Sequence, residues 1–148
     1  MPQIIRWGIL GPGRIAKKFA ADLKLVKDAT LTAIGSRSME SAQAFAAAFP
    51  ATYIHDSYEA LVNNPEVDII YIATPHNFHY ENTMLCLQHG KAVLCEKPFA
   101  INATQAKAMI AMAKEKNVFL MEALWTKFLP HFIKLKELIS GGRIGEVK

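Results

Sequence analysis

The stretch GILGPGRIA, residues 8–16, decides the fold of this chain. Gly11, Gly13 and Ala16 follow the spacing G-x-G-x-x-[GA], directly after an apolar run and before a helical pattern. In this spacing Gly11 allows a tight turn, Gly13 lets the backbone approach a pyrophosphate, and Ala16 lets the helix pack closely on the strand. The first turn of such a helix offers free N–H groups to phosphates. The stretch predicts a dinucleotide-binding turn, although glycines in an ordinary strand-to-helix turn remain the alternative.

Short apolar runs alternate with helical patterns along the rest of the chain. The runs that predict strands are residues 4–10, 30–34, 68–73, 92–95 and 118–121. The apolar residues at helical spacing between them are Ile15, Phe19, Leu23 and Val26, then Ala42, Phe45, Ala46 and Phe49, and later Ala106, Met109, Ile110 and Ala113. This alternation predicts an α/β fold, a doubly wound parallel sheet with helices on both faces. In such sheets the ligand lies at the carboxyl ends of the strands.

Polar residues and glycines mark where the predicted helices begin and end. Asp56 followed by Glu59 fits a capping box, and Asn102 precedes an alanine-rich segment. Gly90 stands where one helix should stop. After the last predicted strand, a further helix should begin near Pro130 and end before GGRIGEVK, whose last five residues resemble the start of another strand. We therefore expect the chain to be the first part of a longer protein.

The composition is that of a single globular domain. The 148 residues are 51% hydrophobic, which is ample material for one core. The 17 basic and 13 acidic residues are scattered, without the basic block that is typical of nucleic-acid binding. The chain lacks an apolar run near the roughly 18 residues that cross a bilayer, and its N-terminus lacks a cleavage signal. We expect a cytoplasmic protein that binds neither nucleic acid nor a membrane.

The two cysteines, Cys86 and Cys95, lie in apolar surroundings without a C-x-x-C spacing. Free cysteines are among the most buried residues in proteins, and disulfides are rare in the cytosol. We expect two buried, reduced thiols.

The end of the second predicted strand determines which dinucleotide is preferred. An acidic residue there would hydrogen-bond the adenosine ribose of NAD, but the sequence between Asp28 and Glu40 contains no carboxylate. Ser36, Arg37 and Ser38 stand where the ribose should lie. Because a guanidinium can clamp a 2′-phosphate through charge-assisted bonds, we expect NADP in preference to NAD. The alternative is a solvated turn in which Arg37 touches nothing.

The segment ATPHNFHYENT follows another predicted strand. Thr74 and Pro75 end that strand, and His76 and His79 stand three residues apart at the opening of a helix. Two histidines at this spacing could bind a metal, but a third ligand is missing from the pattern, so we expect no metal site. We expect the loop, with Asn77, to lie beside the nicotinamide and His79 to face the substrate. Either histidine could instead be a polar residue at a helix entrance.

The segment AVLCEKPFA, residues 92–100, ends a predicted strand on Glu96, Lys97 and Pro98. At the carboxyl end of a strand, a lysine can bring a cation to a ligand site. A solvated Glu–Lys pair is the ordinary alternative.

Together, GPGRIA, SRS and AVLCEKPFA resemble the N-terminal domain of the glucose-fructose oxidoreductase and inositol dehydrogenase family. Within that family, MEALWTKFLP and HNFHYENTMLCLQHGKAVLCEKP are most similar to dimeric dihydrodiol dehydrogenase and NADP-dependent D-xylose dehydrogenase. The resemblance covers essentially the entire chain, and the EKP motif is its most specific part. It implies a Rossmann fold and an NADP-dependent oxidoreductase.

The resemblance also implies roles for individual residues. Lys97 would be the catalytic lysine near the nicotinamide, Glu96 would orient the lysine or the cofactor, and Pro98 would restrict Lys97. His79 completes the expected catalytic set. The expected cofactor contacts are Gly11, Gly13, Arg14, Ile15, Ser36, Arg37, Ser38, Thr74, Pro75, Asn77, Glu96 and Lys97.

The reaction that the resemblance implies is hydride transfer between the nicotinamide and a secondary alcohol or hemiacetal carbon of a sugar or cyclic diol. Residues 1–122 would form the dinucleotide-binding domain, and residues 123–148 would lead into a C-terminal α+β substrate domain outside this sequence. That domain would supply the proton-transfer residue and a homodimer interface, so the chain alone should be inactive. A nucleotide-binding or sensor module without turnover is the alternative.

Three residues after the last predicted strand bear on the substrate. Trp125 and Phe128 match aromatic positions near the substrate of the dihydrodiol dehydrogenase group, although packing in the core is an alternative for both. Relatives often carry Arg where this chain has Lys127, which lacks the bidentate geometry of a guanidinium. An anion-binding role is therefore not expected to carry over to Lys127.

Overall fold

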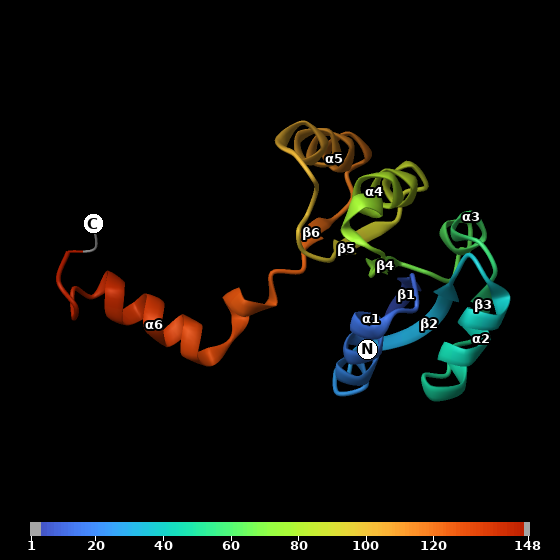
Figure 1. The fold of residues 1–148 in the computed structure, drawn as a ribbon, viewed down its shortest axis with the longest axis horizontal. Helices are drawn as coiled ribbons and strands as arrows, with labels where there is room; N and C mark the ends of the chain where they lie inside the picture. The colour runs from blue at the N-terminus through green and yellow to red at the C-terminus, as the bar shows by residue number, and fades with distance from the viewer. Residues whose placement is uncertain (1–3, 147–148) are drawn as a thin grey trace.

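The computed structural model describes residues 4–146 and contains one six-stranded parallel sheet (Figure 1). Its strands are β1 Ile5–Leu10, β2 Ala29–Gly35, β3 Tyr53–His55, β4 Ile69–Ile72, β5 Ala92–Cys95 and β6 Leu120–Glu122. Their order is β3-β2-β1-β4-β5-β6, and each neighbouring pair is parallel. This is the Rossmann order, so the predicted doubly wound fold is confirmed.

Helices cover both faces of the sheet. They are α1 Arg14–Leu23, α2 Met39–Ala48, α3 Tyr58–Val62, α4 His79–Gln88, α5 Ala103–Lys116 and α6 Pro130–Ser140, with short 3-10 helices η1 His76–Phe78 and η2 Trp125–Phe128. Figure 1 shows α1 and α2 on one face and α3, α4 and α5 on the other. The helix α6 extends away from the sheet and its covering helices.

Two apolar cores lie on the two faces of the sheet. Ile9 packs with residues of α1 and α2, whereas its neighbour Leu10 packs with residues of α3, α4 and α5, and both are fully buried. Alternate residues of a strand point to opposite faces, so β1 serves both cores. The central strand β4 reads IIYI and is buried at each position. A strand covered on both faces gives such a continuous apolar run, and its sequence therefore shows no alternation.

The predicted helix ends are partly confirmed. Asn102 caps α5 by accepting a hydrogen bond from Gln105 N at 2.9 Å, and Gly90, with φ of 69°, follows α4 as expected. The capping box at Asp56 was wrong, because Ser57 caps α3 and accepts from Ala60 N at 3.1 Å. The hydroxyl one residue later reaches the free N–H groups of the first turn. The sequence also gave no sign of β3, a three-residue edge strand too short to show a pattern.

The buried face of α1 also differs from the prediction. We expected Ile15 and Val26 on this face, but they are 41% and 52% exposed. The buried residues are Ala16, Ala20 and Leu23. Small side chains let the helix approach the sheet closely, so Ala16 and Ala20 face inward, together with Leu23 at the end of the helix.

Both cysteines are confirmed as buried and free. Burial raises the pKa of Cys95 to about 12, and it raises the pKa of Cys86 as well. Both thiols therefore stay protonated at neutral pH, which makes them poor nucleophiles.

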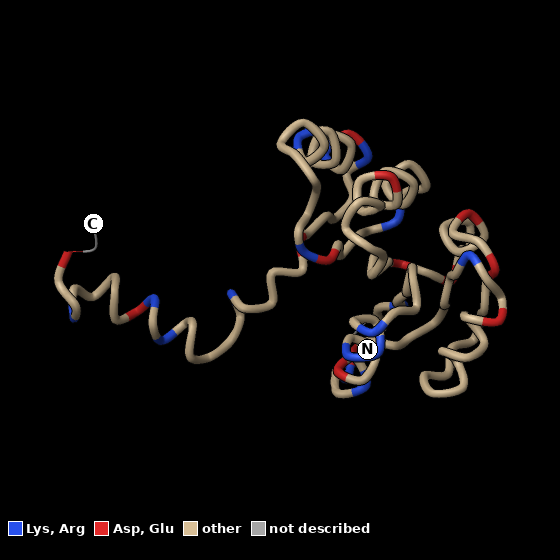
Figure 2. Tube along the Cα trace, viewed as in Figure 1, with Lys and Arg blue, Asp and Glu red and all other residues tan. Residues whose placement is uncertain are grey.

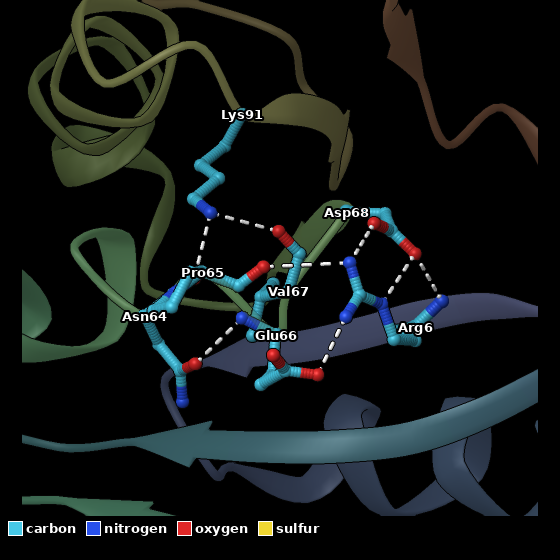
Figure 3. A network of polar contacts seen from close by, with 7 residues as sticks. All are labelled: Arg6, Asn64, Pro65, Glu66, Val67, Asp68 and Lys91. Carbon is cyan, nitrogen blue, oxygen red and sulfur yellow. Dashed lines mark hydrogen bonds and ion pairs between the residues drawn. The ribbon is translucent and has the colours of Figure 1, made fainter.

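A polar network ties together the amino ends of the central strands (Figure 3). The Arg6 guanidinium donates to both carboxylate oxygens of Asp68, at 3.0 and 2.7 Å, and also to Glu66 at 2.6 Å. Lys91 Nζ donates to the carbonyls of Asn64 and Val67 at 2.7 and 2.8 Å. The hydrogen bond from Arg6 lowers the pKa of Asp68, and burial lowers the pKa of Lys91. The charged groups of Arg6, Asp68 and Lys91 therefore form hydrogen bonds with other groups of the fold.

The C-terminal segment contributes little to either core. Apolar residues of α6 remain exposed, among them Phe132, Ile133, Leu135, Leu138 and Ile139. The expected strand in IGEVK is absent from its described part, residues 144–146, and residues 147–148 lie outside the described range. Among residues 4–146, none of the helices has the length and apolar character needed to cross a membrane.

Candidate functional site

The turn between β1 and α1 has the geometry that its glycines predict. Gly11 has a φ of 90°, and a Cβ placed on it would lie 2.9 Å from Thr74 Cγ2 and 3.2 Å from Thr74 N. Both the backbone conformation and the close approach of the next loop therefore require glycine. Gly13 is the N-cap of α1 and has no side chain to accept from the first turn. The first-turn N–H groups are thus available to an anion.

Three loops that follow β1, β4 and β5 meet at the carboxyl edge of the sheet. They enclose a cleft of about 490 Å³. The predicted residues that line this cleft are Arg14, Ile15, Thr74, His79, Glu96, Lys97 and Pro98. Lys18 and His76 line it too, although they were not among the expected site residues. Lys18 lies one helical turn after Arg14, so the i, i+4 spacing was the signal that could have found it.

The charges in this cleft suit an anionic ligand. Arg14, Lys18 and Lys97 line it with one buried carboxylate, that of Glu96, and Lys18 also pairs with Asp22. Figure 2 shows that Lys and Arg dominate the charged positions of α1. Together with the free first-turn N–H groups, these cations form the donor set that a pyrophosphate needs. Within residues 4–146, three or more metal-ligating side chains do not gather anywhere.

Glu96 is held by two hydrogen bonds, one to each of its carboxylate oxygens. The Tyr71 hydroxyl donates to its Oε1 at 2.5 Å, and the Lys97 backbone N donates to its Oε2 at 3.1 Å. Tyr71 is 2% exposed and stacks on Phe19 with ring centroids 3.9 Å apart. Burial and the Glu96 carboxylate raise the pKa of Tyr71, so the hydroxyl stays protonated and continues to donate. The sequence analysis missed Tyr71, because a tyrosine in a buried strand is usually a packing residue.

The turn that carries Lys97 is fixed on both sides. The Lys97–Pro98 peptide bond is cis, a feature that the sequence analysis did not include. Phe99 N donates to Glu122 Oε1 at 2.8 Å, and the Pro98 carbonyl faces His79. The Lys97 side chain is exposed and lines the cleft.

His79 turns inward and joins two loops of the cleft. Its Nδ1 lies 2.8 Å from the Pro98 carbonyl and its Nε2 lies 2.9 Å from the Thr74 carbonyl. The residue is 1% exposed, and both ring nitrogens are engaged by backbone. This geometry favours the alternative of a polar residue at a helix entrance over the expected contact with a substrate. His76, which we had not placed in the site, is exposed and lines the cleft.

A second group of predicted residues lies at the end of β2. Ser36 is 6% exposed, and its N donates to the His55 carbonyl at 3.1 Å. Ser38 N donates to Ser36 Oγ at 3.3 Å, and Ser38 caps α2. Arg37 is exposed, and its Cζ lies 5.6 Å from the ring centroid of Phe78. Arg37 is thus solvent-exposed, as in the alternative of a solvated turn, but it lies beside Phe78, and its contact with a cofactor stays a prediction.

The β4–α4 loop links these two groups. Thr74 lies in the cleft and Phe78 lies beside Arg37, so the exposed residues Pro75 and Asn77 occupy the stretch of chain between them. The predicted cofactor contacts thus form two neighbouring clusters joined by one loop.

Trp125 and Phe128 line a second, mostly apolar cavity of about 550 Å³. This cavity shares Ile15, Lys18 and Glu96 with the cleft, so the two are contiguous. Trp125 and Phe128 are each 57% exposed, which argues against packing in the core. The second cavity is therefore apolar and adjoins the cationic cleft, as ligand pockets with a few polar groups at one side do.

The fold and the cleft define a dinucleotide-binding domain of the Rossmann class. Comparison with known proteins identifies its family. Residues 5–124 match the GFO/IDH/MocA oxidoreductase family with an NAD-binding Rossmann fold, and the chain belongs to that family. This confirms the family resemblance that the sequence motifs indicated.

Individual relatives agree with this assignment. The chain is 41% identical to D-xylose 1-dehydrogenase (NADP(+)) of Hypocrea jecorina, over 99% of this chain and 40% of that protein. It is 40% identical to trans-1,2-dihydrobenzene-1,2-diol dehydrogenase of Mus musculus, over 97% of this chain and 44% of that protein. A 3-ketoreductase from Actinomadura kijaniata, solved with NADP, superposes with a TM-score of 0.90 at 31% identity, over 97% of this chain and 46% of that chain. The chain therefore spans less than half the length of these relatives.

Proposed function

We propose that this chain is the nucleotide-binding part of an NADP-dependent oxidoreductase that acts on a secondary alcohol or hemiacetal carbon of a sugar or cyclic diol. The observation that carries this proposal is the cleft in which Arg14, Glu96 and Lys97 meet beside the glycine turn at Gly11. The names of the two dehydrogenase relatives support the substrate class. The residues expected to contact a dinucleotide lie in the segments that follow β1, β2, β4 and β5, which supports the proposal.

Each group in the cleft has a part in this function. A nicotinamide nucleotide bound there would accept or supply the hydride. The first-turn N–H groups and Arg14 would hold its phosphates. Lys97, which lines the cleft, would hydrogen-bond the reacting oxygen of the substrate through its ammonium and stabilise negative charge that develops on it. Glu96 would act on the backbone of Lys97, since its carboxylate accepts from Lys97 N. We assign His79 to holding the loops together rather than to proton transfer.

The preference for NADP rests on the end of β2. A carboxylate at this place would repel a 2′-phosphate, whereas the SRS sequence presents the guanidinium of Arg37 there. Two of the relatives are described with NADP, which supports the same choice.

The remaining parts of the reaction would come from a second domain. We propose that residues 1–122 form the nucleotide-binding domain and that residues 123–148 lead to an α+β substrate domain, because the relatives are more than twice as long as the chain. Trp125 and Phe128 would border the substrate at the junction, and the second domain would supply proton transfer and a homodimer interface.

The proposal is tested by titrating the chain with NADPH and NADH in a calorimeter. We expect NADPH to bind at least tenfold more tightly, a difference of about 1.4 kcal/mol. Arg37→Ala should remove this preference, whereas Lys107→Ala, which removes an exposed cation on α5, should leave it unchanged. Equal affinities for both nucleotides in the unmodified chain, or an unchanged preference in Arg37→Ala, would contradict the cofactor assignment.

A further inference from the structure

The Arg37 side chain lies beside an aromatic side chain of another element. Its Cζ is 5.6 Å from the ring centroid of Phe78, the last residue of η1. Burial raises the pKa of Tyr58, the first residue of α3, and the positive charge of Arg37 opposes this rise. An exposed arginine thus lies beside an aromatic ring of the β4–α4 segment.

The backbone around Arg37 is fixed independently of its side chain. Ser36 N donates a hydrogen bond to the carbonyl of His55 in β3, and Ser38 N donates a hydrogen bond to the Ser36 hydroxyl. Arg37 therefore has a rigid backbone and one long, rotatable side chain. Ordering such a side chain on binding carries an entropic cost, and a side chain that is already ordered avoids most of it.

We propose that Phe78 is a specificity-determining residue for the cofactor: its ring holds the Arg37 guanidinium in the position that meets the 2′-phosphate of NADP. This inference rests on the proposed function and deepens it. A cation over an aromatic face is attracted by the ring quadrupole, whose face has a negative electrostatic potential, and arginine stacks well because its guanidinium is planar. Phe78 acts through Arg37, so it is a positioning residue and not itself a phosphate ligand.

The position of Phe78 in the chain gives this role a consequence. Phe78 immediately precedes His79, which contacts the carbonyls of Thr74 and Pro98. The loop that supports Arg37 is therefore the same loop that is fastened to the turn carrying Lys97. Through this loop, Phe78 fixes the position of Arg37 relative to the nucleotide cleft.

A double-mutant cycle on nucleotide affinity tests the inference. Calorimetric titrations with NADPH and with NADH are made on the unmodified chain, Phe78→Leu, Arg37→Ala and the double variant. Phe78→Leu should weaken NADPH binding about two- to fivefold, the factor that corresponds to ~0.5–1 kcal/mol for an exposed cation–π contact. NADH binding should stay the same, because NADH lacks the 2′-phosphate. In the Arg37→Ala background, Phe78→Leu should have no further effect on the NADPH to NADH ratio.

Two further variants separate positioning from a general effect on folding. Phe78→Tyr keeps the aromatic face and should keep the NADPH preference. Phe49→Leu removes a similar contact away from the cleft, where Lys24 Nζ lies 5.0 Å from the Phe49 ring, and should leave the preference unchanged. Thermal midpoints of all variants report on folding.

The outcomes distinguish this inference from the proposed function. If Phe78→Leu weakens NADPH and NADH equally, or if its effect persists in the Arg37→Ala background, Phe78 has only a structural role and the inference is wrong. If Arg37→Ala removes the preference but Phe78→Leu does not change it, the inference is also wrong while the proposed function stands. If Arg37→Ala leaves the preference intact, the cofactor assignment fails, and the role of Phe78 fails with it.

Discussion

Lys91 and Lys97 lie on either side of β5 and show how differently the two edges of one sheet use a lysine. Lys91, at the amino end, donates to the carbonyls of Asn64 and Val67, and burial lowers its pKa. Lys97, at the carboxyl end, is exposed and lines the cleft. The lysine at the amino edge is thus satisfied within the fold, whereas the lysine at the carboxyl edge remains available. The first arrangement favours stability, and the second favours ligand binding.

Among the substitutions that test this difference between the two edges, that of Lys97 should have the largest effect, and the effect should be on kcat. In the proposed two-domain protein, Lys97→Met should lower kcat by about 10²–10⁴-fold, because the charged group that we propose acts at the reacting oxygen is removed. The thermal midpoint should change little, since the Lys97 side chain is exposed. Steady-state kinetics and thermal unfolding measure the two effects. Normal turnover in this variant would make Lys97 an ordinary surface charge.

Substitution of Gly11 should affect binding and stability together. Gly11→Ala places a side chain at a φ of 90° and 2.9 Å from Thr74 Cγ2. The left-handed conformation alone costs about 1–2 kcal/mol for a residue with a Cβ. We expect this loss in chemical denaturation and a more than tenfold loss of NADPH affinity in calorimetry. Gly90→Ala has the same backbone penalty at φ of 69° with open space around it, so it should lose stability but keep NADPH affinity. Equal affinity losses in both variants would contradict a local role for Gly11.

Substitution of Lys91 should lower stability and leave nucleotide binding unchanged, which is the reverse of the effect expected for Lys97. Lys91→Met removes two hydrogen bonds from a charged donor and leaves two carbonyls without it. We expect a loss of about 1–2 kcal/mol in the free energy of unfolding, measured with urea. NADPH affinity should stay within a factor of two, because the substitution lies at the other end of β5. A large loss of affinity with unchanged stability would overturn the distinction between the two edges.

Loss of the Arg6–Asp68 ion pair should have the smallest effect on the free energy of unfolding, and this effect should depend on pH. Arg6 lowers the pKa of Asp68 below the usual 3.8, so acidification protonates the unfolded chain first. The stabilisation is therefore complete above about pH 3.8 and is lost as the pH falls through the folded pKa. Asp68→Asn should be less stable than the unmodified chain at pH 7, by less than Lys91→Met, and the difference should shrink below this pH. Urea midpoints between pH 2.5 and 7 on the two proteins measure it. A difference that is constant with pH would exclude the ion pair as its cause.

Local features of the sequence determined the fold class and much of the site. The turn at Gly11 and Gly13 depends on the conformational range of single residues, and the strand and helix patterns depend on spacing along the chain. Parallel strands bring their carboxyl ends to one edge, so the segments with Thr74 and Lys97 could be placed near that turn before the structure was known. The missing carboxylate beside Arg37 could be read directly from the sequence.

Only the tertiary structure decided which side chains meet across these segments. The pairs Tyr71 with Glu96, His79 with Pro98, and Arg37 with Phe78 join different elements, and neither partner has a spacing that predicts the other. His79 was expected to face a substrate, and the structure shows in addition that both of its ring nitrogens lie against backbone carbonyls, those of Thr74 and Pro98. The sequence set the backbone conformations because they depend on neighbouring residues. The side-chain contacts depend on the packing of distant segments in three dimensions, and so they became visible only in the fold.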